Sequence, residues 1–178
     1  MKCILALTLF FYCMTAPAKG MVMEEIRELY KNAPVEENAC ERLIALLDSL
    51  KQKNPVLQGY KGSATMMMAQ HVSNPFLKLS YFHKGKAMLH QAIDADQENM
   101  ELRFLRFAAQ TNAPAMLGYR GEIQNDKRLI LDDLFQSEDQ SLNKLIIEYL
   151  KNSKYLDKEE KHTLTTLTSR CRAISNTT

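Results

Sequence analysis

The 178-residue sequence carries 23 lysine or arginine residues against 21 aspartate or glutamate residues, so its net charge is small. These charges are interspersed along the chain, which argues against the concentrated basic face that nucleic-acid binding requires. Hydrophobic residues make up 46% of the chain, and its length suits one domain with a core that can fold without disulfide staples.

The first eighteen residues have the features of a secretory signal peptide. Lys2 supplies a positive charge, an apolar run occupies residues 4–14, and small residues suited to cleavage stand at 16–18. We therefore expect export, cleavage near Ala18, and a single mature domain over residues 19–178 in the periplasm or outside the cell. The apolar run is shorter than the roughly 20 residues a spanning helix needs, so no stable transmembrane span is predicted.

Apolar residues recur with the 3.6-residue period of α-helices, and the alternation typical of strands is nearly absent. The predicted fold class is therefore all-α, with about eight antiparallel helices joined by short turns. In chain order, the stripes that predict these helices are Met23, Ile26 and Tyr30; Cys40, Leu43, Leu47 and Leu50; Leu57, Tyr60, Ala64, Met67 and His71; Phe82, Leu89 and Ile93; Leu102, Leu105 and Ala109; Ile123, Ile130 and Leu134; Leu142, Leu145, Ile146, Tyr149 and Leu150; and Leu164, Leu167, Cys171 and Ile174.

Prolines and capping residues predict where several of these helices begin. Proline is favoured at the first helical position, because the N–H that it lacks would have no partner there. The prolines in this position are Pro34, Pro55, Pro75 and Pro114. The predicted N-caps are Asn54, Asn74, Ser137 with Gln140 as its reciprocal partner, and Asp157 with Glu160.

One octet occurs twice: PVLQGYKG at 55–62 returns as PAMLGYRG at 114–121. The same offset also aligns leucines in the preceding helices. This predicts a duplicated unit of three helices, residues 35–94 and 95–153, followed by a capping helix over 157–175. The alternative is chance similarity, since the match is weak outside the octet.

Two stretches resemble known families. GKAMLHQAIDADQENMELRFLRF, residues 85–107, is similar to the junction between two tetratricopeptide-type (TPR-like) hairpins, although Gln97 stands where that family has proline. The second resemblance is to a family of uncharacterised exported bacterial proteins. It is carried by the phrases NPFLKLSYFHKGK and ELRFLRFAAQTNAPAMLGY, followed by Ile123, Asp126 and Lys127. That resemblance implies export and an all-helical fold, and it brings no activity, cofactor or catalytic residue.

The tyrosines of the octets are candidate binding residues. The glycines beside them would cost about 1 kcal/mol each inside a helix relative to alanine, so their presence calls for a reason. One is that glycine admits a crossing helix while the tyrosine packs beside it. The other is a groove with two similar half-sites that receives a peptide or an anionic group, formed by Tyr60 with Lys61 and by Tyr119 with Arg120.

Arg103 and Arg106 lie on an otherwise apolar helix and present donors suited to a carboxylate or phosphate. An inward-facing pair would recognise an anion. Alternatively, their stems cover apolar surface and their heads pair with Asp94, Asp96 or Glu98 around the preceding turn.

No metal site, cofactor or catalytic constellation is predicted, because the histidines do not converge and no nucleophile with a base can be assembled. The mature cysteines, Cys40 and Cys171, form either one disulfide in an oxidising compartment or two buried thiols.

These observations predict a non-enzymatic interaction or scaffold module of the cell envelope. Its partner would be another envelope protein or a peptide, bound at a groove bordered by the helices that carry Tyr60, Arg103, Arg106 and Tyr119. The alternative is a carrier that encloses a small apolar or anionic ligand in a pocket of about 300 Å³ or more, lined by Met67, Phe82 and Phe104 with an arginine at its mouth. The sequence leaves the oligomeric state open.

Overall fold

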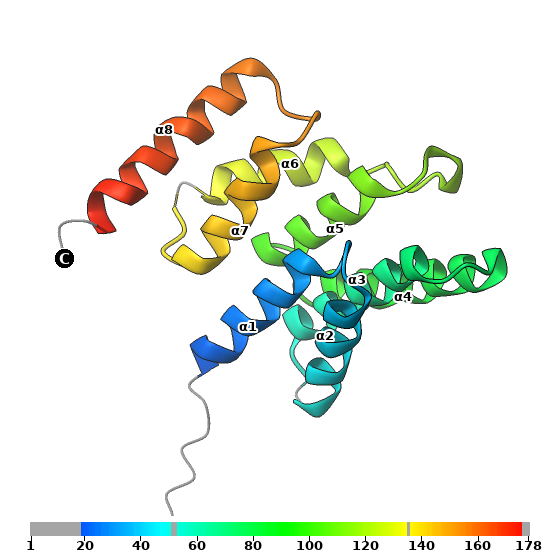
Figure 1. The fold of residues 1–178 in the computed structure, drawn as a ribbon. Helices are drawn as coiled ribbons and strands as arrows, with labels where there is room; N and C mark the ends of the chain where they lie inside the picture. Colours follow the sequence, from blue (N-terminus) through cyan, green and yellow to red (C-terminus); the bar gives the residue numbers. More distant parts are fainter. Residues whose placement is uncertain (1–18, 51–52, 135, 176–178) are drawn as a thin grey trace, which may run out of the picture.

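A computed structural model describes residues 19–50, 53–134 and 136–175 of the chain, with side chains from residue 20 to residue 166. The predicted signal peptide lies outside the described residues. The described part contains eight α-helices, one 3-10 turn and no strand, which confirms the all-α class (Figure 1). The elements are α1 (Lys19–Asn32), α2 (Glu37–Ser49), α3 (Pro55–His71), α4 (Pro75–Ala95), α5 (Met100–Asn112), η1 (Ala115–Leu117), α6 (Ile123–Leu134), α7 (Gln140–Lys151) and α8 (Lys158–Ser175).

A single cluster of buried apolar side chains extends from α1 to α8. Its largest fully buried members come from all eight helices; they include Ile26, Tyr60, Leu89, Phe104 and Ile146. None of the described helices is both long and apolar enough to cross a membrane.

Helices α3 and α4 lie side by side as a hairpin, and glycine allows their backbones to touch (Figure 1). A Cβ atom on Gly62 would lie 2.7 Å from the backbone nitrogen of Leu89 and 2.8 Å from the carbonyl oxygen of Gly85. A Cβ atom on Gly85 would lie 2.7 Å from the backbone nitrogen of Met66. The first octet therefore uses glycine to admit a neighbouring helix, as the first of the two interpretations expects.

Three of the predicted helix starts, those of α3, α4 and α8, are confirmed. The side chain of Asn54 accepts a hydrogen bond from the N–H of Val56 at 2.8 Å, and that of Asn74 accepts from Phe76 at 2.9 Å. At α8, the side chain of Asp157 accepts from the N–H of Glu160 while that of Glu160 accepts from the N–H of Asp157. These reciprocal bonds form the expected capping box.

The helix starts predicted at Pro34 and at Ser137 are wrong. Pro34 lies in the turn that precedes α2, which begins at Glu37. Helix α7 is capped by Asp139 rather than Ser137: the Asp139 carboxylate accepts from the N–H of Leu142 at 2.9 Å. Two residues earlier, the Ser137 hydroxyl instead accepts from the N–H of Asp139 at 3.3 Å.

The second octet does not repeat the conformation of the first. Pro114 begins only the short turn η1, which Gly118 ends in the left-handed conformation with φ 60°. That backbone conformation favours glycine and stops helical propagation, so the expected helix start at Pro114 is wrong. The two octets share a buried tyrosine, and the duplication itself stays a prediction.

Candidate functional site

Two of the predicted binding residues, Arg103 and Arg106, converge on one carboxylate. Arg106 donates two hydrogen bonds to Asp126, from Nε at 2.7 Å and from Nη2 at 2.6 Å. Arg103 reaches the same carboxylate at 3.4 Å and donates from Nε to the carbonyl oxygen of Gln97 at 2.6 Å. Because Asp126 is fully buried, the cluster joins α5 to α6 inside the domain. The pairing expected with carboxylates at 94–98 is thus corrected, since α6 packs against α5 and supplies the partner.

The first octet's pair, Tyr60 and Lys61, also has partners within the domain. Tyr60 is fully buried and donates its hydroxyl to Oε1 of Glu101 at 2.6 Å. Burial and the negative charge of Glu101 raise the pKa of Tyr60 well above its ordinary value. Lys61 forms an ion pair with Asp48 on α2. Both side chains therefore hold neighbouring helices to α3.

The second octet's pair lies in different surroundings. The ring of Tyr119 packs edge-on against Phe82, with centroids 5.7 Å apart, and the Lys86 ammonium lies 4.8 Å from its centroid. Its buried hydroxyl has no hydrogen-bond partner, and burial raises its pKa to about 12. Arg120 donates to the carbonyl oxygen of Ala113 at 3.1 Å. The structure thus gives Tyr60 and Tyr119 separate sets of neighbours, and ligand binding by the six residues stays a prediction.

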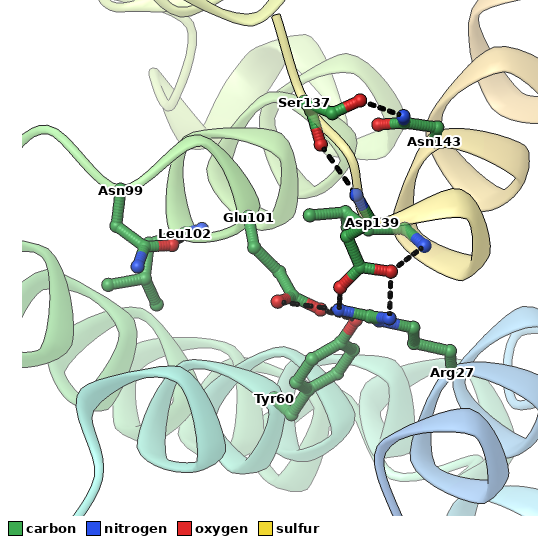
Figure 2. A network of polar contacts seen from close by, with 9 residues as sticks. Arg27, Tyr60, Asn99, Glu101, Leu102, Ser137, Asp139 and Asn143 are labelled. Atoms are coloured by element: carbon green, nitrogen blue, oxygen red, sulfur yellow. Dashed lines mark hydrogen bonds and ion pairs between the residues drawn. The ribbon is translucent and has the colours of Figure 1, made fainter. Parts of the chain in front are cut away.

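A buried arginine that the sequence did not single out makes the densest polar contacts (Figure 2). Arg27 on α1 donates to Glu101 from Nε at 2.8 Å and from Nη2 at 3.0 Å. It also donates to Asp139 from Nη1 at 3.0 Å and from Nη2 at 2.9 Å. Because Tyr60 donates to the same Glu101, this Arg27 network joins α1, α3, α5 and the N-cap of α7.

Hydrogen bonds in the Arg27 network favour the charged forms of Arg27 and Asp139. Burial alone would lower the pKa of Arg27, but its hydrogen bonds to Glu101 and Asp139 outweigh burial and raise it. For Asp139, burial acts to raise the pKa, and the hydrogen bonds from Arg27 prevail and lower it. A permanently charged guanidinium paired with carboxylates suits a structural clamp.

A sequence feature does mark these residues. Arg27 lies four residues after Met23 and three before Tyr30, on the apolar face of its helix. Glu101 lies three residues before Phe104 and four before Leu105, on the apolar face of α5. A charge on an apolar helical face indicates a buried partner, although the sequence does not say which one.

The Arg27 network should make stability depend on pH. Since folding lowers the pKa of Asp139, its contribution is present at neutral pH and is lost as pH falls through the folded-state value. Asp139→Asn keeps an N-cap residue but removes the charge, so we expect a lower Tm than wild type at neutral pH. The difference should shrink between about pH 6 and pH 3, measured by circular dichroism. A difference that stays constant over this range would contradict the assignment.

An apolar groove of about 890 Å³ lies between the α3–α4 hairpin and helices α1, α5 and α7. Its side chains come from α1, α3, α4, α5, η1 and α7. They include the three that the carrier hypothesis expects, Met67, Phe82 and Phe104. The arginine expected at the mouth is not among them; Lys31 and Lys78 are the lining cations.

The rim of the apolar groove exposes large hydrophobic side chains, while its floor holds an unpaired hydroxyl. Met116 on η1 is 92% exposed and Leu79 on α4 is 45% exposed. Ser63 lines the groove, is 2% exposed, and its Oγ has no hydrogen-bond partner. An unpaired buried hydroxyl costs about 1–3 kcal/mol, so an occupant that offers it a polar group would gain affinity.

The cysteines give no disulfide within the described part of the chain. Cys40 is buried, its Sγ contacts the carbonyl oxygen of Ala64 at 3.3 Å, and burial raises its pKa to about 11. The side chain of Cys171 lies outside the described residues, so the pairing stays a prediction. Among the side chains that are described, no three His, Cys, Asp or Glu residues cluster as metal ligands would.

Comparisons with known proteins give no relative from which a function could be transferred. The chain matches no family model, no curated protein and no solved structure. The features of the chain that bear on its function are therefore the apolar groove and the Arg27 network that joins the helices around it.

Proposed function

We propose that this chain is an exported, non-enzymatic interaction module of the cell envelope that holds an apolar segment of a partner protein. The observation that carries the proposal is the apolar groove, with its open rim at Met116 and Leu79. Exposed apolar surface is unfavourable in water, and a contiguous patch of it on a soluble domain marks a contact site.

The composition of the apolar groove favours a protein segment as its occupant. Three methionines line it: Met66, Met67 and Met116. Unbranched thioether side chains change rotamer at low cost and adapt to different apolar shapes, which suits peptide partners. The anchoring of the surrounding helices by Arg27 keeps the walls in place while the methionines adjust.

A second candidate is a carrier of a small apolar ligand. The volume of the apolar groove lies within the range of about 300–1,000 Å³ that is typical of small-molecule sites. Met67, Phe82 and Phe104 line it, and Ser63 offers a hydrogen bond to a polar group on such a ligand. The exposure of Met116 favours the first candidate, because a carrier encloses its ligand.

Site-specific photocrosslinking tests the proposal. A photoreactive phenylalanine analogue at Met116 should form one predominant protein adduct in the envelope fraction. The same analogue at Glu159, an exposed position on α8, should not form it. Adducts of lipid size, together with a small molecule in the native mass spectrum, would favour the carrier. The same adducts at both positions, or none at either, would contradict both candidates.

A further inference from the structure

We infer that the segment held in the apolar groove is an amphipathic helix with acidic residues flanking its apolar face. The inference rests on the proposed function and names the chemistry of the partner. It follows from the shape of the groove walls and from the charge of α4.

Helix α4 forms one wall of the apolar groove with a single stripe of side chains. Pro75, Lys78, Leu79 and Phe82 line it at positions i, i+3, i+4 and i+7. At 1.5 Å per residue this stripe is roughly 10 Å long, or two helical turns. A wall of this kind has ridges and hollows spaced as on any helix, so a helical face with the same spacing fits against it.

Apolar side chains of α5 and η1 also line the groove. Phe104 and Ala108, one turn apart on α5, line the groove, and Met116 on η1 continues the wall to the rim. A helix in the groove would lie against the exposed apolar side chains of α4 and η1. It would also cover Leu79 and Met116, which the domain leaves exposed.

The positive charge of α4 favours acidic residues beside the apolar face of the bound helix. No aspartate or glutamate occurs between His71 and Asp94, whereas this stretch contains Lys78, Lys84 and Lys86. Lys78 is exposed and lines the apolar groove. The other lining lysine, Lys31, is already paired with Glu148 at 3.0 Å, which among the described residues leaves Lys78 as the lining charge without an ion-pair partner.

This charge disfavours a second copy of the chain as the occupant. A symmetric pair would bring two α4 helices together, and like charges placed opposite each other repel. An acidic helix would be attracted by the lysines of α4, whereas a second copy of α4 would be repelled by them. A preference of roughly five- to tenfold corresponds to about 1–1.4 kcal/mol, which one or two exposed ion pairs supply.

Two synthetic helical peptides provide the test. They share a leucine face with spacing i, i+3, i+4 and i+7, and differ only in having glutamate or lysine at the flanking positions. With the chain from Lys19 onwards, fluorescence anisotropy should show about five- to tenfold tighter binding of the glutamate peptide at low salt, and a smaller preference at high salt. Lys78→Glu should abolish or reverse the preference, whereas Lys158→Glu, the same charge change on α8, should leave it intact. Met116→Asp should weaken both peptides.

The outcomes separate this inference from the proposed function. Equal binding of both peptides, a preference for lysine, or a glutamate preference that survives Lys78→Glu would overturn the acidic-helix inference alone. Failure of both peptides to bind would overturn the proposed function with it. A concentration-dependent dimer in sedimentation, lost in Met116→Asp, would identify a second copy as the occupant and overturn the inference.

Discussion

Replacing Arg27 with methionine should lower the free energy of unfolding by about 3–5 kcal/mol, because it leaves charge buried without its partner. Glu101 is 7% exposed and receives two of the four hydrogen bonds from Arg27, so the variant strands a carboxylate in the interior. Methionine keeps most of the apolar stem, which confines the change to the charged head. Urea denaturation followed by circular dichroism measures the loss.

Two further variants make the Arg27 result interpretable. Arg128→Met removes an arginine whose side chain is 66% exposed, and should change stability by no more than about 0.5 kcal/mol. Adding Glu101→Leu to Arg27→Met removes the stranded carboxylate, and should recover part of the lost stability. A loss for Arg27→Met no greater than that for Arg128→Met would show that the buried clamp contributes nothing to folding.

Gly85→Ala should destabilise the domain by about 2 kcal/mol or more, although alanine is the better helix former by about 1 kcal/mol. The added Cβ would lie against the backbone of α3, at the carbonyl oxygen of Gly62 and 2.7 Å from the nitrogen of Met66. Backbone atoms cannot turn aside as a side chain can, so α3 and α4 must move apart. The midpoint of urea denaturation reports the effect.

Gly121→Ala serves as the matched control for Gly85→Ala. No atom lies within 4 Å of a Cβ built on Gly121, and its φ is not positive. We expect a change within about 0.5 kcal/mol. If Gly85→Ala changed the free energy of unfolding as little as Gly121→Ala, the close approach of α3 and α4 would not require glycine at position 85.

The sequence predicts those features of the fold that depend on neighbouring residues. Helical periodicity gives the all-α class, and local caps give the starts of α3, α4 and α8, since Asn54, Asn74 and Asp157 bond to backbone within three residues. It fails at α7, where Asp139 rather than the predicted Ser137 is the N-cap, because a contact distant in sequence holds the Asp139 side chain. Arg27, 112 residues away, holds the carboxylate.

Most of the candidate site depends on long-range contacts that composition and spacing do not determine. Arg106 was expected to pair near its own turn, yet Asp126 on the next helix reaches it. The tyrosines of the octets were singled out by repetition, and the structure buries both. The carrier hypothesis names three lining residues of the apolar groove correctly, but it does not include the side chains of α1, η1 and α7 that line the rest.

The clamp at Arg27 has a consequence for how the chain is made. Its bonds to Glu101 and Asp139 span 74 and 112 residues, so α1 leaves the ribosome well before its second anchor exists. Closing so large a loop late is entropically demanding, and we expect a slow final step in folding. Repeat proteins whose units contact only their neighbours can be shortened by whole hairpins. Because Arg27 joins distant helices, we expect that truncating this chain between hairpins yields no stably folded fragment.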